Sequence, residues 1–210
     1  MYENERELVA AAGRRLAEGG LVIGTAGNLS VRVGDHLVVT GSGTDLGALT
    51  PAALPVVDLD GTVLDGELTP TSELPLHLAI YRGTGARAVA HAHSPSSIAV
   101  GCTHDVLPPI HYMTVRLGGV LRVAEYATFG TPELADNVLA ALDGRAAALM
   151  RNHGSVAYGV SISEACGRLE TVEWLAEVYR RAAALGPPRL LSDDELAAAA
   201  DQFTRLDYGR

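Results

Sequence analysis

The chain has 210 residues, of which 48% are hydrophobic, and a formal net charge of −9. This length predicts one domain over residues 1–210, and the hydrophobic fraction excludes disorder over most of the chain. The acidic balance argues against a nucleic-acid partner, whose binding surface would be basic. An anionic substrate would therefore need a local positive site, such as a metal ion or helix N-termini.

The sequence contains no sign of export or membrane insertion. Cys102 and Cys166 lie far apart and make no disulfide framework, so we expect free, buried thiols in a reducing cytoplasm. The first residues are acidic where a secretory signal would be basic. No apolar run approaches the roughly 20 residues of a bilayer span, so we expect no membrane partner.

The first 68 residues predict one helix followed by short strands. Hydrophobic residues recur at helical spacing over 2–19, and Gly19-Gly20 ends this pattern. The other elements expected here are a loop of small residues leading into a strand (24–32), a strand (36–40), a small polar loop (41–44), a short helix near 50–53, and two strands (56–59 and 63–64) joined by an Asp60-Gly61 turn. The glycines of the first loop would let N–H groups approach an anion, with Asn28 as a further donor, although a plain turn is the alternative.

The stretch 69–75 opens a helix that reaches about residue 82, with Thr71 or Ser72 as its cap. Capping hydroxyls and free N–H groups at a helix start favour an anion. Glu73 lies in the first turn, where the helix dipole alone would explain a carboxylate. His77, four residues later on the same face, could be a metal ligand, but we favour a packing or supporting role because other histidines supply a set.

A short apolar run over 86–90 predicts a buried strand that ends in His91-Ala92-His93. Residues two apart on a strand point to the same side of the sheet, so the two imidazoles share one face. Together they form half of a metal site. Glu73 upstream and His153 downstream are the candidates that would complete a four-ligand site suited to zinc. Each histidine taken alone could be an ordinary core or surface residue.

Helices and strands alternate through the rest of the chain. Thr131 caps a helix over 132–142, and Ser161 or Ser163 begins a long helix to about Leu185. The other expected elements are a Ser94-capped helix to about Val100, an extended stretch (108–113), strands at 120–124 and 146–150, and a C-terminal helix and mobile tail (190–210) that begins with a capping box at Ser192. This alternation predicts a three-layer α/β/α sandwich around a mainly antiparallel or mixed sheet.

Six ordered motifs resemble the class II aldolase/adducin family, and most closely its zinc-dependent L-fuculose-phosphate aldolase branch. They extend over nearly the whole chain: 24–32, Thr71-Ser72-Glu73, His91-Ala92-His93, Ile110-His111-Tyr112-Met113, 126–131 and Asn152-His153-Gly154. The resemblance implies a metal-dependent aldolase that reversibly cleaves a ketose 1-phosphate, such as L-fuculose 1-phosphate, into dihydroxyacetone phosphate and an aldehyde. It also implies a homotetramer with active sites at its subunit interfaces.

The same resemblance assigns roles to residues. It implies that zinc, or another divalent ion such as Mn²⁺ or Co²⁺, is bound by Glu73, His91, His93 and His153. Glu73 would also be the acid/base of turnover. Tyr112 would reach a neighbouring subunit's site and protonate the aldehyde oxygen, and Tyr208 in the tail is the candidate for a second tyrosine. The implied phosphate pocket consists of Gly27, Asn28, Ser42, Gly43, Thr71 and Ser72.

Other activities of the family remain alternatives. A sugar-phosphate 4-epimerase would use the same metal site, but that branch resembles Pro-Ser-Ser-Asp at the helix start, where this chain has Glu73, and it carries an Asp that 114–117 lacks. Decarboxylases, dehydratases, and aldolases acting on 5-deoxy-pentulose or ribulose 1-phosphates are further possibilities. Adducin-like members are non-enzymatic interaction modules without the metal ligands, which this chain retains. We therefore favour an aldolase, while the sugar stays open.

Overall fold

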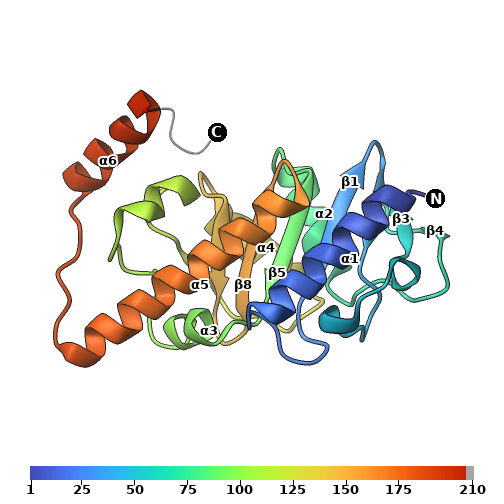
Figure 1. Ribbon diagram of the computed structural model, residues 1–210, viewed down its shortest axis with the longest axis horizontal. Helices are drawn as coiled ribbons and strands as arrows, with labels where there is room; N and C mark the ends of the chain where they lie inside the picture. The colour runs from blue at the N-terminus through green and yellow to red at the C-terminus, as the bar shows by residue number, and fades with distance from the viewer. Residues whose placement is uncertain (207–210) are drawn as a thin grey trace.

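In the computed structural model, which describes residues 1–206, eight strands form one sheet with helices on both faces (Figure 1). The strands are β1 (Asn28–Val33), β2 (His36–Val39), β3 (Val56–Asp58), β4 (Val63–Asp65), β5 (Ala88–Ala92), β6 (Val123–Ala124), β7 (Ala147–Met150) and β8 (Gly154–Gly159). Their order is β4-β3-β2-β1-β5-β8-β7-β6. All neighbours are antiparallel except β6 and β7, which run parallel. The predicted α/β fold with a mixed sheet is confirmed.

The helices divide between the two faces of the sheet. They are α1 (Glu3–Glu18), α2 (Leu74–Gly83), α3 (Pro95–Gly101), α4 (Pro132–Leu142), α5 (Ile162–Leu185) and α6 (Asp193–Leu206), with short 3₁₀ turns at Leu46–Ala48, Pro51–Ala53 and Tyr112–Leu117. Alternation along β5 marks the two layers: Ala88 and Ala90 lie in the core beneath α1, α3 and α5, while Val89 lies in the core beneath α2 and α4. Helix α6 stands apart from both layers (Figure 1).

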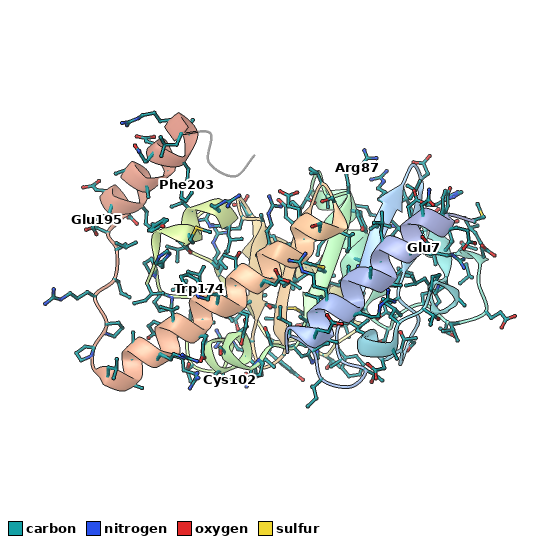
Figure 2. The ribbon with its side chains drawn as sticks, viewed as in Figure 1. Glu7, Arg87, Cys102, Trp174, Glu195 and Phe203 are labelled. Atoms are coloured by element: carbon teal, nitrogen blue, oxygen red, sulfur yellow. The ribbon has the colours of Figure 1, made fainter. Side chains whose placement is uncertain are left out.

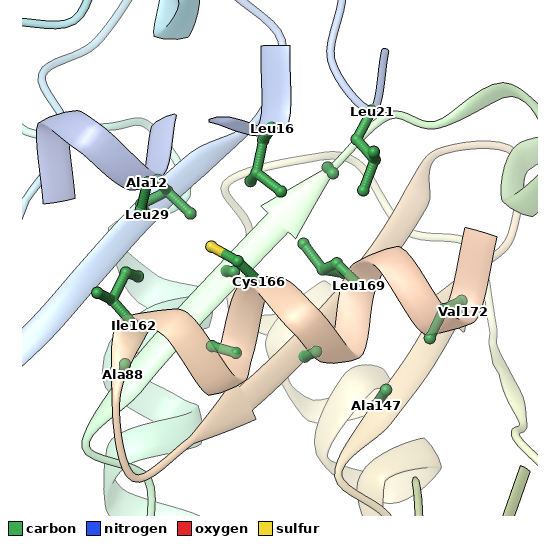
Figure 3. Close-up of a cluster of buried hydrophobic side chains, with 14 of the residues drawn as sticks. Ala12, Leu16, Leu21, Leu29, Ala88, Ala147, Ile162, Cys166, Leu169 and Val172 are labelled. Carbon is green, nitrogen blue, oxygen red and sulfur yellow. The ribbon is translucent and has the colours of Figure 1, made fainter. Parts of the chain in front are cut away.

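Small side chains allow α5 to pack closely on the sheet. Figure 3 shows Leu169 and Val172 of α5 in a buried cluster with Ala88 and Ala147 of the strands below. The chain is only 5% aromatic, so alanine, leucine and valine fill this core. The Cys166 thiol is buried in the same cluster, and burial raises its pKa to about 12. Cys102 is free as expected, but it is exposed rather than buried.

Three elements differ from the prediction. The prediction did not include strand β8, a short segment that begins at Gly154 and ends at Gly159. Its burial comes from pairing with β5 on one side and β7 on the other, which the local sequence does not reveal. The stretch expected to be extended passes into the 3₁₀ helix Tyr112–Leu117, whose start is capped by the Nδ1 atom of His111 accepting from the Met113 N–H. The strand expected over 120–124 is reduced to β6, Val123–Ala124.

Gly154 at the start of β8 provides a test of packing beside the histidines. A Cβ at this position would overlap the carbonyl oxygen of Ala92 and lie 3.2 Å from Cε1 of His91. Both neighbours are buried, so we expect Gly154→Ala to lower the free energy of unfolding by about 1–3 kcal/mol. Gly167, inside α5, has open space around it, and Gly167→Ala should raise that free energy by about 0.5–1 kcal/mol. Urea unfolding of both variants checks this pair, and equal effects would contradict it.

Candidate metal centre

The four expected ligands lie together where β5 ends, on the sheet face covered by α2. His91 is in β5 opposite Val156 of β8, and His93 follows the end of β5. Because β5 and β8 are antiparallel neighbours, the end of β5 adjoins the start of β8, which brings His153 beside them. Glu73 lies at the start of α2. One ligand atom from each residue lies within 4.8 Å of every other.

The side chains converge on a common point. Glu73 Oε2 lies 3.1 Å from His91 Nε2, and Oε1 lies 3.5 Å from His153 Nε2. His93 Nε2 lies 2.9 Å from His91 Nε2. The three imidazole rings are 4.8–4.9 Å apart, centroid to centroid, and nearly perpendicular to one another. This arrangement directs several lone pairs into one small volume.

A backbone contact fixes the ring of His91. Its Nδ1 lies 3.0 Å from the carbonyl oxygen of Ser155 in β8. A carbonyl can only accept, so Nδ1 carries the hydrogen and the Nε2 lone pair faces the cluster. This is how metal-binding histidines are generally oriented.

The electrostatics favour the neutral imidazoles of His93 and His153 and the ionised carboxylate of Glu73, the forms that bind a metal ion. Burial and then the neighbouring His91 imidazole lower the pKa of His93 to about 4, and the same two causes lower the pKa of His153 to about 4. Burial opposes ionisation of Glu73, but the His91 and His153 imidazoles and the Asn28 amide together lower its pKa. Burial likewise opposes the charge on His91, yet the Glu73 carboxylate raises its pKa.

The residues present fit a divalent metal ion. Glu73 Oε1 is buried and makes no hydrogen bond within residues 1–206, and a buried carboxylate oxygen without a partner is costly unless a cation balances it. Three neutral imidazoles and one carboxylate are a donor set suited to zinc and to similar ions such as Co²⁺. The donor set and the unpaired oxygen both indicate a metal centre.

The start of α2 differs from the prediction. The helix begins at Leu74 with Glu73 as its N-cap residue, so neither Thr71 nor Ser72 is the cap. The Thr71 hydroxyl instead accepts from the Glu73 N–H at 3.3 Å. The Glu73 side chain makes no capping bond, because its carboxylate is turned toward Asn28 and His91.

His77, for which a packing or supporting role was expected, lies outside the ligand cluster. Its side chain is fully buried. The Nε2 atom lies 2.6 Å from Asn28 Oδ1, and the Asn28 Nδ2 donates to Glu73 Oε2 at 2.9 Å. Asn28 therefore links the histidine to the carboxylate.

The buried His77 should make the metal-free protein sensitive to acid. Burial lowers the pKa of His77 to about 3, against about 6.5 in an unfolded chain. Between these values the unfolded chain binds a proton that the folded protein does not, so the free energy of unfolding falls as pH falls, by up to about 1.4 kcal/mol per pH unit. We expect His77→Gln to reduce this loss between about pH 6.5 and pH 4. Urea unfolding across that range measures it, with His104→Gln, which changes a histidine outside the cluster, as the control. If the free energy of unfolding depends on pH equally steeply in His77→Gln and in the unchanged protein, the prediction is wrong.

A cleft of about 320 Å³ opens beside the cluster. All six residues of the expected phosphate pocket line it, together with Glu73, His93 and His153. Gly27 and Gly43 have φ values of +98° and +71°, a backbone region that glycine adopts most readily. No lysine or arginine of residues 1–206 lines this cleft. An anion there would depend on hydroxyls, amides and backbone N–H groups, and on a bound cation.

The cleft is also lined by seven residues that the candidate set omitted: Thr25, Ala26, Gly41, Tyr126, Ala127, Phe129 and Asn152. Gly41 lies in the small polar loop 41–44, and each of the others lies within one of the motifs 24–32, 126–131 and 152–154, so the signal was present in the sequence. The motifs do not say which side chains face the cleft, and that depends on how the loops pack.

Of the two candidate tyrosines, the structure describes only Tyr112, which lies outside the cleft. Tyr112 is half-exposed and lines a separate groove with residues of α6, where its ring lies 5.9 Å from that of Phe203. Figure 2 shows Phe203 on α6 and Trp174 on α5. Tyr112 therefore does not reach the cleft of its own chain. Tyr208 lies outside the described residues.

Within residues 1–206, every helix is too short or too polar to cross a bilayer.

The chain is similar to known proteins over nearly its whole length. The family model described as Class II Aldolase and Adducin N-terminal domain matches residues 7–180. A 5-deoxy-D-ribulose 1-phosphate aldolase of Bacillus thuringiensis serovar kurstaki is 34% identical over 206 residues, which are 97% of each chain. An L-fuculose phosphate aldolase of Escherichia coli is 38% identical over 187 residues, 88% of this chain and 86% of the relative. A solved structure of an L-fuculose 1-phosphate aldolase matches with a TM-score of 0.91 at 36% identity over 96% of each chain.

Proposed function

Since the chain belongs to the class II aldolase and adducin family, as its motifs indicated, we propose that it is a metal-dependent aldolase acting on a ketose 1-phosphate. It would reversibly cleave its substrate into dihydroxyacetone phosphate and an aldehyde. The observation that carries this proposal is the cluster of Glu73, His91, His93 and His153 beside a cleft that the candidate phosphate-binding residues also line. A non-catalytic interaction module has no need of such a cluster.

The four clustered residues would hold the metal, zinc being the proposed ion. When bound, a divalent ion acts as a Lewis acid that polarises the substrate carbonyl. In the direction of synthesis, the Glu73 carboxylate, whose pKa is lowered by its neighbours, is proposed to remove a proton from the hydroxymethyl carbon of dihydroxyacetone phosphate, which leaves an enediolate. That carbon then bonds to the aldehyde carbon to form the C3–C4 bond, and the aldehyde oxygen takes up a proton from the hydroxyl of Tyr112 of a neighbouring subunit. Cleavage is the reverse: the C4 hydroxyl proton returns to Tyr112, the C3–C4 bond breaks, and the protonated Glu73 returns its proton to C3 of the enediolate.

The candidate phosphate pocket would orient the substrate. Ser42, Thr71 and Ser72, which carry hydroxyls, and Gly27 and Gly43 of the glycine loops line the same cleft as Glu73, His93 and His153. Holding the phosphate there would place the carbonyl end of a short sugar beside Glu73 and the histidines. The matched relatives are named for different sugars, 5-deoxy-D-ribulose 1-phosphate and L-fuculose phosphate. These names support the substrate class, and an L-fuculose 1-phosphate-like ketose is the proposed member of it.

We also propose a homotetramer with shared active sites, located in the cytoplasm. Tyr112 is half-exposed and does not line the cleft of its own chain, which supports a role in a neighbouring subunit's site. The free thiols Cys102 and Cys166 favour a reducing compartment. Light scattering of the purified protein measures the subunit number, and a monomer at assay concentration would contradict the shared site.

The activity is tested by following dihydroxyacetone phosphate release from a panel of ketose 1-phosphates that includes L-fuculose and 5-deoxy-D-ribulose 1-phosphates. The protein is assayed as purified, after removal of metal by a chelator, and after resupply of zinc. We expect release from at least one substrate, loss of release after chelation, and recovery with zinc. Release that persists unchanged in metal-free protein, or no release from any member, would contradict the proposal.

A further inference from the structure

We propose that His77, backed by Ser30 and Tyr81, positions the Glu73 carboxylate through Asn28 and so tunes metal affinity. His77, Ser30 and Tyr81 are not among the four clustered ligands and do not line the cleft, so they are positioning residues rather than catalytic ones. The inference rests on the proposed function, because the position of Glu73 matters in this way only if a metal is bound beside it.

The five residues form a ladder between one helix and one strand. Glu73, His77 and Tyr81 recur every four residues at and beyond the start of α2, while Asn28 and Ser30 are two apart on β1. These spacings place each set on one face of its element. The contacts alternate between the two elements: Tyr81 OH to Ser30 Oγ at 2.8 Å, Ser30 Oγ to His77 Nδ1 at 2.6 Å, His77 Nε2 to Asn28 Oδ1 at 2.6 Å, and Asn28 Nδ2 to Glu73 Oε2 at 2.9 Å.

The hydrogens of this ladder can be placed from one end. A carboxylate only accepts, so the Asn28 amide must turn its Nδ2 toward Glu73 and its Oδ1 toward His77. The His77 Nε2 must then carry a hydrogen. Burial keeps the imidazole neutral by lowering its pKa, so its Nδ1 accepts from the Ser30 hydroxyl. Because the Ser30 hydroxyl donates its one hydrogen to His77, its oxygen accepts from the Tyr81 hydroxyl. Every donor in the ladder thus points toward Glu73.

Burial stabilises this arrangement of hydrogen bonds. Ser30 and His77 are fully buried, and Tyr81, Asn28 and Glu73 are at most 4% exposed, so water does not compete for their bonds. A buried polar network is costly unless every member is paired. All of these groups are paired except Glu73 Oε1, the atom that faces His153. The ladder therefore holds one carboxylate oxygen and leaves the other for a metal ion.

His77 fixes the orientation of the Asn28 side-chain amide. An amide can rotate by half a turn at little steric cost, and this would place the Asn28 oxygen against the Glu73 carboxylate. The His77 Nε2–H blocks that rotation because it needs an acceptor. Groups that support metal ligands typically contribute 10–100-fold to metal affinity.

Two substitutions at position 77 separate positioning from packing. The amide of glutamine reaches the place of Nε2, so His77→Gln retains a donor for Asn28. The amide of asparagine reaches only the place of Nδ1, so His77→Asn retains the contact with Ser30 and loses the donor. Both remove the ring. His104→Asn, which changes a histidine outside the ladder that contacts Tyr179, is the control.

The measurement is a titration of metal-free protein with Co²⁺, read as affinity and as the visible absorption spectrum of the bound ion. We expect His77→Asn to weaken Co²⁺ binding by about 10-fold and to alter the spectrum, and His77→Gln and His104→Asn to resemble the unchanged protein. If His77→Asn does not fold, Ser30→Ala is titrated instead. This change removes the hydroxyl that keeps the hydrogen of His77 on Nε2, so it should also weaken Co²⁺ binding.

Four results would overturn the assignment. A folded His77→Asn with unchanged affinity and spectrum would show that the ladder does not position Glu73. Equal losses in His77→Asn and His77→Gln would show a packing role only. Where Ser30→Ala stands in for His77→Asn, unchanged binding in Ser30→Ala would exclude the ladder. If the unchanged protein fails to bind Co²⁺, the proposed metal centre is wrong and the positioning role of His77 falls with it. If the unchanged protein binds Co²⁺ and one of the first three results is found, only the positioning role is wrong.

Discussion

Glu73→Gln should lower kcat for dihydroxyacetone phosphate release by about 10²- to 10⁴-fold, the usual contribution of general acid–base catalysis, while the fold and most of the bound zinc remain. Glutamine has nearly the same shape and can still accept from the Asn28 amide, which contacts Glu73 Oε2 at 2.9 Å. It cannot take up and return a proton. Steady-state kinetics, far-ultraviolet circular dichroism and elemental analysis of the same preparation provide the measurement.

Glu7→Gln is the matched control for this variant, because Glu7 lies exposed on α1 (Figure 2) and belongs to neither the ligand cluster nor the cleft. It should turn over at the rate of the unchanged protein. Turnover of Glu73→Gln close to that rate would refute the role of Glu73 as the acid/base.

His93→Ala should remove zinc from the protein, and with it the activity. His93 Nε2 lies 2.9 Å from His91 Nε2, and the low pKa of His93, about 4, keeps it a neutral ligand near pH 7. Its loss leaves three donors and an open side toward the cleft. Because His93 is only partly buried, the fold should persist. Elemental analysis after gel filtration measures the metal.

The control for this substitution is His104→Ala, which changes a histidine of the described chain that is not in the cluster. It should retain zinc like the unchanged protein. Stoichiometric zinc in His93→Ala would contradict the proposed ligand set.

Local patterns predicted most of the elements correctly. Thr131 caps α4 by accepting from the Leu134 N–H, and Ser161 caps α5 by accepting from the Glu164 N–H. Ser192 and Glu195 form the expected capping box at α6. These contacts span only three residues, so the sequence contains all the information that they need.

The prediction failed where distant segments decide the outcome. The start of α2 was misplaced because the Glu73 side chain is drawn to Asn28 and His91, which local capping rules do not consider. Strand β8 was missed because its burial comes from β5 and β7 on either side rather than from a pattern of its own.

The sequence by itself determined the chemistry that is available: three histidines and a carboxylate in family motifs, glycine and hydroxyl loops, and an alternation of helices and strands that requires a covered sheet. Only the tertiary structure decided which of these groups meet. Antiparallel pairing of β5 with β8 places His153 beside His91, and packing of α2 on β1 aligns Tyr81, Ser30 and His77 behind Asn28. The physical reason is that periodicity fixes the face on which a side chain lies, whereas pairing between elements fixes its neighbours.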